Sequence, residues 1–159
     1  MNDIGQAGEL RETTSSAFGP VQVTAAESRP FWYEFESAHV GDVVVARIAS
    51  SPCTVRRTSH SAGNARMVKV VLLTRGRCGF EQGGRQSVLA PGHLSVFTCE
   101  RPYEFTTREP AEVIVAGIPS GRLGSHVDVL RQQPPRTNLR RAVRHCPDGG
   151  ARCREHLGS

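Results

Sequence analysis

The side chains best suited to chemistry gather behind a Pro-Gly turn, in the stretch LAPGHLSVFTCERPYEF over residues 89–105. His93 follows the turn directly, and Cys99, Glu100 and Tyr103 lie further along. Imidazole, thiolate and carboxylate groups are metal ligands, so this cluster could form a metal site. It could equally be a strand turn with a ligand pocket behind it. The first alternative would make the protein an enzyme and the second a sensor.

A metal site in a small β barrel needs several ligands that converge on one ion. Two histidines separated by one residue on a strand point to the same face. A carboxylate and a third histidine complete the set of ligands. The stretch RRTSHSAGNARMVKV offers only His60, and the next acid along the chain is Glu81. His93 is expected to cap a strand, and Tyr103 stands where a further histidine ligand would be expected. The pattern therefore predicts no metal ion, and we interpret the stretch as a strand turn.

Other catalytic patterns are missing from the sequence. Ser59 and Ser61 flank His60 but lack the glycine-framed turn of a nucleophile elbow, and no glycine-rich phosphate loop joins a strand to a helix. Cys99, beside Glu100, fits a buried strand cysteine better than a reactive thiol. We therefore predict no catalytic residue, no cofactor and no enzymatic activity.

The chain of 159 residues is long enough for one domain with its own core. At about this size roughly 68–70% of the unfolded surface is buried on folding. No apolar run approaches the ~20 residues of a membrane helix, and the amino terminus lacks the pattern of a secretory signal. The five cysteines are odd in number and scattered. A cytoplasmic protein with reduced thiols and no membrane partner is expected.

The net charge of +5 is concentrated at the carboxyl end. Between residues 136 and 159 six arginines face only Asp148 and Glu155, which gives +4 and leaves +1 for the other 135 residues. The body is therefore not built around a nucleic-acid-binding surface. Residues 133–159 hold too few large aliphatic side chains to form a core, so we predict a disordered tail or a short marginal helix around residues 137–145. Its composition resembles GC-rich DNA translated out of frame, which suggests a frameshift near residue 132.

From Gly41 onward, short runs rich in Val, Ile, Leu and Phe are broken by Gly, Pro and Asn, which is typical of an antiparallel β domain. Gly83 and Gly84 supply the positive φ angles that a two-residue hairpin turn demands. In HLSVFTC both faces of the strand are apolar, so one face should meet the core and the other should be covered. The expected strands are 42–50, 53–58, 66–74, 77–82, 85–89, 93–99, 102–107 and 111–118.

Both ends of this β region differ from it in pattern. Residues 1–29 are polar without sustained periodicity, so we expect a flexible arm. The aromatic run PFWYEF that follows should dock as an edge strand or latch, unless its rings stack on a ligand. Beyond Pro119, the side chains of Leu123, Val127 and Leu130 fall on one helical stripe. This amphipathic helix must bury its stripe on the barrel or on a second copy of the chain.

Three longer motifs, HVGDVVVARIASSPCTVRRT, VVLLTRGRCGFEQGGRQSVLAPGHLSVFTCERPYEF and VIVAGIPSGRLG, resemble the effector-binding half of AraC/XylS-type transcription regulators. The resemblance covers about residues 30–132, and His93 stands where the family usually has Asp after Pro-Gly. It is carried, in chain order, by Gly41-Asp42, Arg47, Arg57-Thr58, Gly76, Glu81-Gln82, Gly84-Arg85, Leu89, Pro91-Gly92, Arg101-Pro102-Tyr103, Ile118-Pro119 and Leu123-Gly124.

The resemblance implies a mainly β, cupin-like antiparallel barrel or sandwich without metal, followed by an amphipathic α-helix. It divides the chain into an arm (1–29), an effector-binding and dimerisation domain (30–132) and a tail (133–159). Family members also carry a helix-turn-helix half, which we expect to be absent here, so that this chain alone would not bind specific DNA. It would then be a truncated or stand-alone sensor that forms a homodimer or pairs with a full-length homologue. The alternative is a small cupin-fold enzyme, an isomerase or a dioxygenase.

The expected ligand is a small-molecule effector of unknown identity. Aromatic walls with one or two polar tips suit such ligands, so we expect Trp32, His60, Phe97 and Tyr103 to line the pocket. Arg47 and Arg57 could pair with a carboxylate effector, or could stabilise the fold through Asp42 or Glu100. Leu123, Val127 and Leu130 are expected to form the dimerisation helix.

Overall fold

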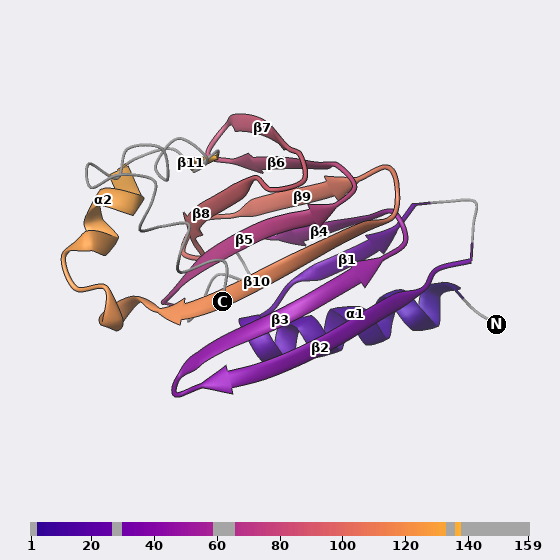
Figure 1. Ribbon diagram of the computed structural model, residues 1–159, viewed down its shortest axis with the longest axis horizontal. Helices are drawn as coiled ribbons and strands as arrows, with labels where there is room; N and C mark the ends of the chain where they lie inside the picture. Colours follow the sequence, from indigo (N-terminus) through magenta and orange to yellow (C-terminus); the bar gives the residue numbers. More distant parts are fainter. Residues whose placement is uncertain (1–2, 27–29, 59–65, 133–135, 138–159) are drawn as a thin grey trace, which may run out of the picture.

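The computed structural model describes residues 3–26, 30–58, 66–132 and 136–137. In these ranges the chain forms two antiparallel β-sheets packed face to face, with a helix along one edge (Figure 1). Short alternating strands bury one face each, so two such sheets enclose a core between them. The prediction of a mainly β fold is confirmed.

Strand order explains how distant parts of the sequence come together. The five-stranded sheet has the order β1-β4-β9-β6-β7, formed by Gln22–Ala25, Cys53–Arg57, Tyr103–Thr107, Cys78–Gln82 and Arg85–Leu89. The six-stranded sheet has the order β11-β8-β5-β10-β3-β2, formed by Arg136–Thr137, Leu94–Thr98, Met67–Arg75, Ala111–Pro119, Val43–Ser50 and Tyr33–Val40. Strands β3 to β10 match the eight predicted ranges to within a residue at each end.

Two predicted turns are present. Gly83 and Gly84 adopt φ of 61° and 74° between β6 and β7, as a two-residue hairpin turn requires. In the Pro-Gly turn before β8, the backbone N–H of His93 donates to the carbonyl of Ala90 at 2.9 Å, and Gly92 has φ of 85°. The Pro-Gly segment at residues 90–93 is therefore a strand turn.

Side chains from both sheets interlock in the centre of the sandwich. Phe80, Phe97, Tyr103 and Phe105 form an aromatic cluster with ring centroids 4.5–5.8 Å apart. These distances are ordinary for tilted and edge-on aromatic packing. The cluster fixes the separation of the two sheets at one end of the core.

The amino-terminal residues fold onto the sandwich. Sequence analysis expected a flexible arm over residues 1–29, but helix α1 spans Asp3–Phe18 and β1 follows it. Leu10 and Phe18 are buried in the two main core clusters, which explains the order of this segment. Gly19, with φ of 85°, ends the helix by donating its N–H to the carbonyl of Ser15 at 2.9 Å.

The aromatic run PFWYEF behaves as an edge element. Phe31 is buried against α1, while the side chain of Trp32 is 43% exposed. The run continues into β2, the edge strand of the six-stranded sheet. Its alternation between inward and outward side chains is that of a strand on a half-buried sheet.

The helical segment after β10 is shorter than predicted. Pro119 still pairs with Met67 at the end of β10, the 3-10 turn η2 spans Ser120–Arg122, and helix α2 spans His126–Gln132. Val127 is buried, whereas Leu123 precedes the helix. The side chain of Leu130 lies outside the described part of the structure. Residues 136–137 of the predicted tail form β11 beside β8. No helix in the described ranges is long and apolar enough to cross a membrane.

Candidate functional site

An apolar cavity lies between the two sheets. Its volume is about 100 Å³. Helix α1 contacts β1 and β2, the edge strands of the two sheets, and so covers the cavity along that edge (Figure 1). The walls are formed by Leu10, Thr14 and Phe18 from α1, by Cys53, Val55, Cys78, Tyr103, Phe105 and Thr107 from the five-stranded sheet, and by Ile48, Ser50, Lys69, Val71, Ala111, Val113 and Val115 from the six-stranded sheet and its end.

Lys69 places a charged group in this apolar wall. It lies in β5, where alternation sends it inward with Val71, and it is only 4% exposed. Its Nζ donates to the hydroxyl oxygen of Tyr103 at 2.5 Å and lies 5.2 and 5.0 Å from the ring centres of Phe18 and Tyr103. Burial lowers the pKa of the amine to about 8, and the nearby guanidinium of Arg57 acts in the same direction. The amine is therefore still charged at neutral pH.

The hydroxyl of Tyr103 lies between two buried cations. Arg57 is fully buried and hydrogen-bonds to the phenol, while Lys69 donates to it from the other sheet. Burial raises the pKa of Tyr103 well above its usual range, so the phenol keeps its proton. A phenol oxygen that accepts from Lys69 and Arg57 can still donate its own proton to a third group.

The thiols in the cavity wall are unsuited to nucleophilic chemistry. Burial raises the pKa of Cys78 to about 12 and also raises that of Cys53. Cys99 lies near Lys69 and is not part of the cavity wall, and burial raises the pKa of its thiol as well. Because the thiolate is the reactive form, these buried cysteines pack as small apolar side chains.

The four predicted pocket residues lie in different places relative to the cavity. Tyr103 lines the cavity. Phe97 is 1% exposed and lies behind the wall, in the aromatic cluster. Trp32, which precedes β2, is largely exposed and does not line the cavity. His60 lies outside the described residues.

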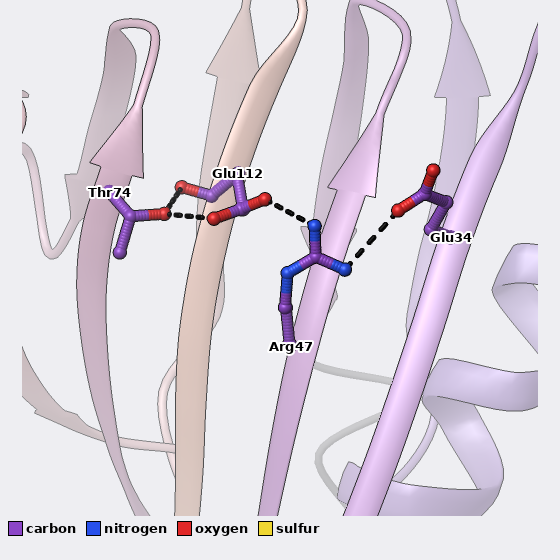
Figure 2. Close-up of polar contacts among 4 residues, drawn as sticks. All are labelled: Glu34, Arg47, Thr74 and Glu112. Atoms are coloured by element: carbon purple, nitrogen blue, oxygen red, sulfur yellow. Dashed lines mark hydrogen bonds and ion pairs between the residues drawn. The ribbon is translucent and has the colours of Figure 1, made fainter.

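The two arginines considered for effector binding lie in different environments. Arg47 is on the outer face of the six-stranded sheet, where it joins Glu112 at 2.6 Å and Glu34 at 3.2 Å (Figure 2). Its protein partners are therefore two glutamates and not Asp42, whose carboxylate pairs with Arg122. Arg57, in contrast, is inside the sandwich beside Tyr103.

The turn at His93 has no metal-binding geometry. Its Nδ1 accepts a hydrogen bond from the backbone N–H of Ala90 at 3.2 Å, which holds the turn before β8. In the described part of the chain, no three side chains of the metal-binding types come together.

A second hollow is open to solvent over β4, β9 and the β6–β7 turn. Its volume is about 550 Å³, and it reaches the far side of Tyr103. Arg56 and Glu104 in its wall pair with each other. An open, mixed-charge surface of this kind holds small ligands less well than an enclosed apolar cavity.

Sequence reasoning missed Lys69 and the three residues of α1 that close the cavity. A single lysine in the apolar run MVKVVLL was the available signal for Lys69. For α1, the signals were the spacing of Leu10, Thr14 and Phe18 and the Gly19-Pro20 stop. The run ETTSS between them has weak helix propensity and concealed the pattern.

Sequence and fold together define a two-sheet antiparallel β sandwich with an apolar cavity between its sheets. The family model described as AraC-binding-like domain matches residues 10–158, and the chain belongs to this family. The match includes residues 10–29 of the predicted arm and residues 133–158 of the predicted tail. The resemblance drawn from the sequence motifs is confirmed.

The fold is similar to that of a solved regulator structure. The crystal structure of the AraC-like transcriptional activator CuxR aligns with a TM-score of 0.69 at 18% identity, over 82% of this chain and 50% of that chain. This chain thus spans about half the length of that regulator. The Cnp3 cupin domain of Schizosaccharomyces pombe aligns with a TM-score of 0.48 at 6% identity, over 60% of this chain and 71% of that one. A search of curated protein sequences finds no match.

Proposed function

We propose that the protein is the ligand-sensing domain of an AraC-type transcription regulator and that its effector binds between the two sheets. The observation that carries this proposal is the apolar cavity between the sheets with two convergent polar groups, Lys69 and Tyr103. Largely apolar cavities with a few fixed polar groups are the usual form of small-molecule sites. Membership of the AraC-binding-like family supports the same role.

Helix α1 is the element through which an effector would change the domain. Leu10, Thr14 and Phe18 are at once residues of α1 and part of the cavity wall. An effector that contacts them stabilises one position of the helix over others. Moving a two-state element from 1:99 to 99:1 requires about 5.5 kcal/mol of differential affinity.

Two substitutions on α1 separate this role from general helix stability. Leu10→Ala removes a buried side chain from the cavity wall, whereas Glu12→Ala changes an exposed side chain on the same helix. Effector affinity should fall for Leu10→Ala and stay unchanged for Glu12→Ala. Equal affinity of both variants would show that α1 takes no part in binding.

We further propose that copies of the chain, or this chain and a full-length homologue, associate through α2. Val127 is buried within its own chain, but Val129 on the same helix is 47% exposed. Val129→Glu should shift the equilibrium toward monomer in light scattering at matched concentrations. A sensor of this type would work in the cytoplasm, without catalysis, and would leave specific DNA recognition to a helix-turn-helix unit.

The first experiment is a thermal-shift screen of small metabolites against the wild-type chain and Val113→Phe, which fills the cavity from β10. Ligands of the cavity should raise Tm of the wild type and not of the variant. Mass spectrometry should recover each ligand unchanged. Turnover would favour the cupin-enzyme alternative. Ligands that raise Tm of Val113→Phe as much as that of the wild type would contradict the cavity as the effector site.

A further inference from the structure

Lys69 is a buried cation whose described neighbours include no carboxylate. Its polar contact is the neutral hydroxyl of Tyr103, and the other close groups are the rings of Phe18 and Tyr103. No Asp or Glu lines the cavity, and none pairs with Lys69 in the described part of the chain. Among the residues that the structure describes, the cavity wall therefore carries a positive charge and no carboxylate.

Such an arrangement is costly unless something compensates it. A charge moved from water into an apolar interior is destabilising unless it is paired. Arg57, a second buried cation close to Lys69, adds repulsion. Cys99 cannot supply the missing charge, because burial keeps its thiol protonated at neutral pH. Methionine would fill the same space without this penalty, so the amine points to a ligand that uses it.

The remaining polar groups of the wall are mostly engaged. The hydroxyl of Ser50 contacts the thiol of Cys53, and Thr107 Oγ1 bonds to the backbone of Cys53. A sugar or other polyol would leave most of its hydroxyls without partners in this cavity, at a penalty for each. One strongly polar end and an apolar body fit the wall better.

We propose that the effector is a small organic acid, whose carboxylate accepts hydrogen bonds from the ammonium of Lys69 and the hydroxyl of Tyr103. This inference rests on the proposed function, in which the cavity is the effector site. The apolar body would lie against Leu10, Val71, Val113 and Val115. A cavity of about 100 Å³ calls for a compact ligand, since an apolar cavity of ~150 Å³ takes up benzene.

The ligand would also contact both sheets of the domain at the same time. Lys69 lies in the six-stranded sheet and Tyr103 in the five-stranded sheet. The ring of Phe18, the last residue of α1, packs against the ammonium of Lys69. A carboxylate between Lys69 and Tyr103 changes the charge next to the Phe18 ring, and so changes how the carboxyl end of α1 packs.

The test is calorimetric titration with propanoate and butanoate, each compared with its neutral amide. The acids should bind the wild type at least tenfold more tightly than propanamide and butanamide. Lys69→Met should abolish this preference while keeping the fold, because it removes a buried charge. Tyr103→Phe should weaken acid binding severalfold and leave amide binding unchanged.

Acid binding should also depend on pH. Affinity for butanoate should fall about tenfold per pH unit above pH 8, as Lys69 loses its proton, while affinity for butanamide stays level. Burial raises the pKa of Tyr103 and that of Cys99 above their ordinary values, so neither group produces this change near pH 8.

The outcomes separate this inference from the proposed function. If the amides bind as well as the acids and Val113→Phe abolishes both, the cavity is a ligand site and the acid inference is wrong. If acid binding survives Val113→Phe or Lys69→Met, the carboxylate does not bind in the cavity and the inference is also wrong. If none of the four probes binds, both the inference and the proposed cavity site are contradicted for compounds of this size.

Discussion

The ammonium of Lys69 donates a 2.5 Å hydrogen bond to the hydroxyl oxygen of Tyr103, across the interior from one sheet to the other. Most hydrogen bonds of a β sandwich run within a sheet, so a bond between sheets ties the two layers at one point. This point is also the polar end of the cavity. Occupancy of the cavity and the packing of the two sheets are therefore coupled through the same pair of side chains.

Lys69→Met should make the chain more stable at neutral pH. The amine is charged up to pH 10.5 in the unfolded chain but only up to about pH 8 in the folded protein. Below pH 8 both states are protonated and the folded state carries the whole penalty, at most about 3 kcal/mol at 1.36 kcal/mol per pKa unit. Loss of the bond to Tyr103 offsets ~1 kcal/mol of the gain.

The pH dependence of this difference gives a second check. Between pH 8 and 10.5 the unfolded state binds more protons at Lys69 than the folded state, so wild-type stability rises toward that of Lys69→Met. Urea unfolding of both proteins at pH 7 and pH 9.5 measures the change. The comparison cancels the titration of Cys53 and Cys78, whose pKa shifts do not involve Lys69. A difference that is constant with pH would mean that Lys69 titrates normally in the folded state.

The buried thiols should resist labelling until the protein unfolds. At pH 8 the thiolate fraction of Cys78, with its pKa raised from 9.0 to about 12, is about a thousandfold below that of an ordinary cysteine. Replacing Cys146 and Cys153 with serine removes the tail thiols from the signal. Reaction with a disulfide reagent should then follow global opening and quicken in urea, and rapid labelling of Cys53 or Cys78 in the native state would contradict the buried placement.

The β framework was predictable because its signals are local. Alternating apolar residues between Gly, Pro and Asn turns set strands β3 to β10 without knowledge of their neighbours. Helix α1 was not predictable in the same way, since its stability comes from burying Leu10 and Phe18 against strands distant in the sequence. Tyr103 was found because its motif lies beside a turn. Lys69 was missed because alternation in MVKVVLL leaves apolar residues on both faces and does not show which face meets the cavity.

The two ion pairs of Arg47 on the outer face of the six-stranded sheet should contribute unequally to the free energy of unfolding. Arg47 lies diagonally between Glu112 on β10 and Glu34 on β2, and Thr74 on β5 donates to Glu112 at 2.8 Å (Figure 2). Bonds from Thr74 and then Arg47 lower the pKa of Glu112, so this stabilisation is present at neutral pH and is lost as the pH falls through its folded-state pKa.

Double-mutant cycles measure this difference between the two pairs. Arg47→Met combined with Glu112→Gln should show the larger coupling, and Arg47→Met combined with Glu34→Gln the smaller, because the Glu34 side chain is 61% exposed. Both couplings should shrink in high salt. Equal couplings would show that Thr74 does not fix Glu112 in place.

The last prediction concerns the contact that holds the carboxyl end of α1 on the sheet. Gly117 in β10 has no side chain, and this leaves room for Phe18 and Met67. A Cβ at this position would lie 2.7 Å from Met67 Sδ and 3.0 Å from Phe18 Cδ1. Met67 can move at little cost because its thioether is flexible, but the Phe18 ring is 1% exposed and fixed in the core.

Gly117→Ala should therefore destabilise the fold by about 1–3 kcal/mol, as overpacking of a filled core does. Gly79→Ala is the matched control, since it is also in a strand and its Cβ would meet only the carbonyl oxygen of Thr106, at an ordinary 3.6 Å. Hydrogen exchange should quicken in α1 for Gly117→Ala and stay at the wild-type rate for Gly79→Ala. If both variants loosen α1 equally, strand glycine in general limits stability. If only Gly117→Ala does, the Phe18 contact is what keeps the helix closed over the cavity.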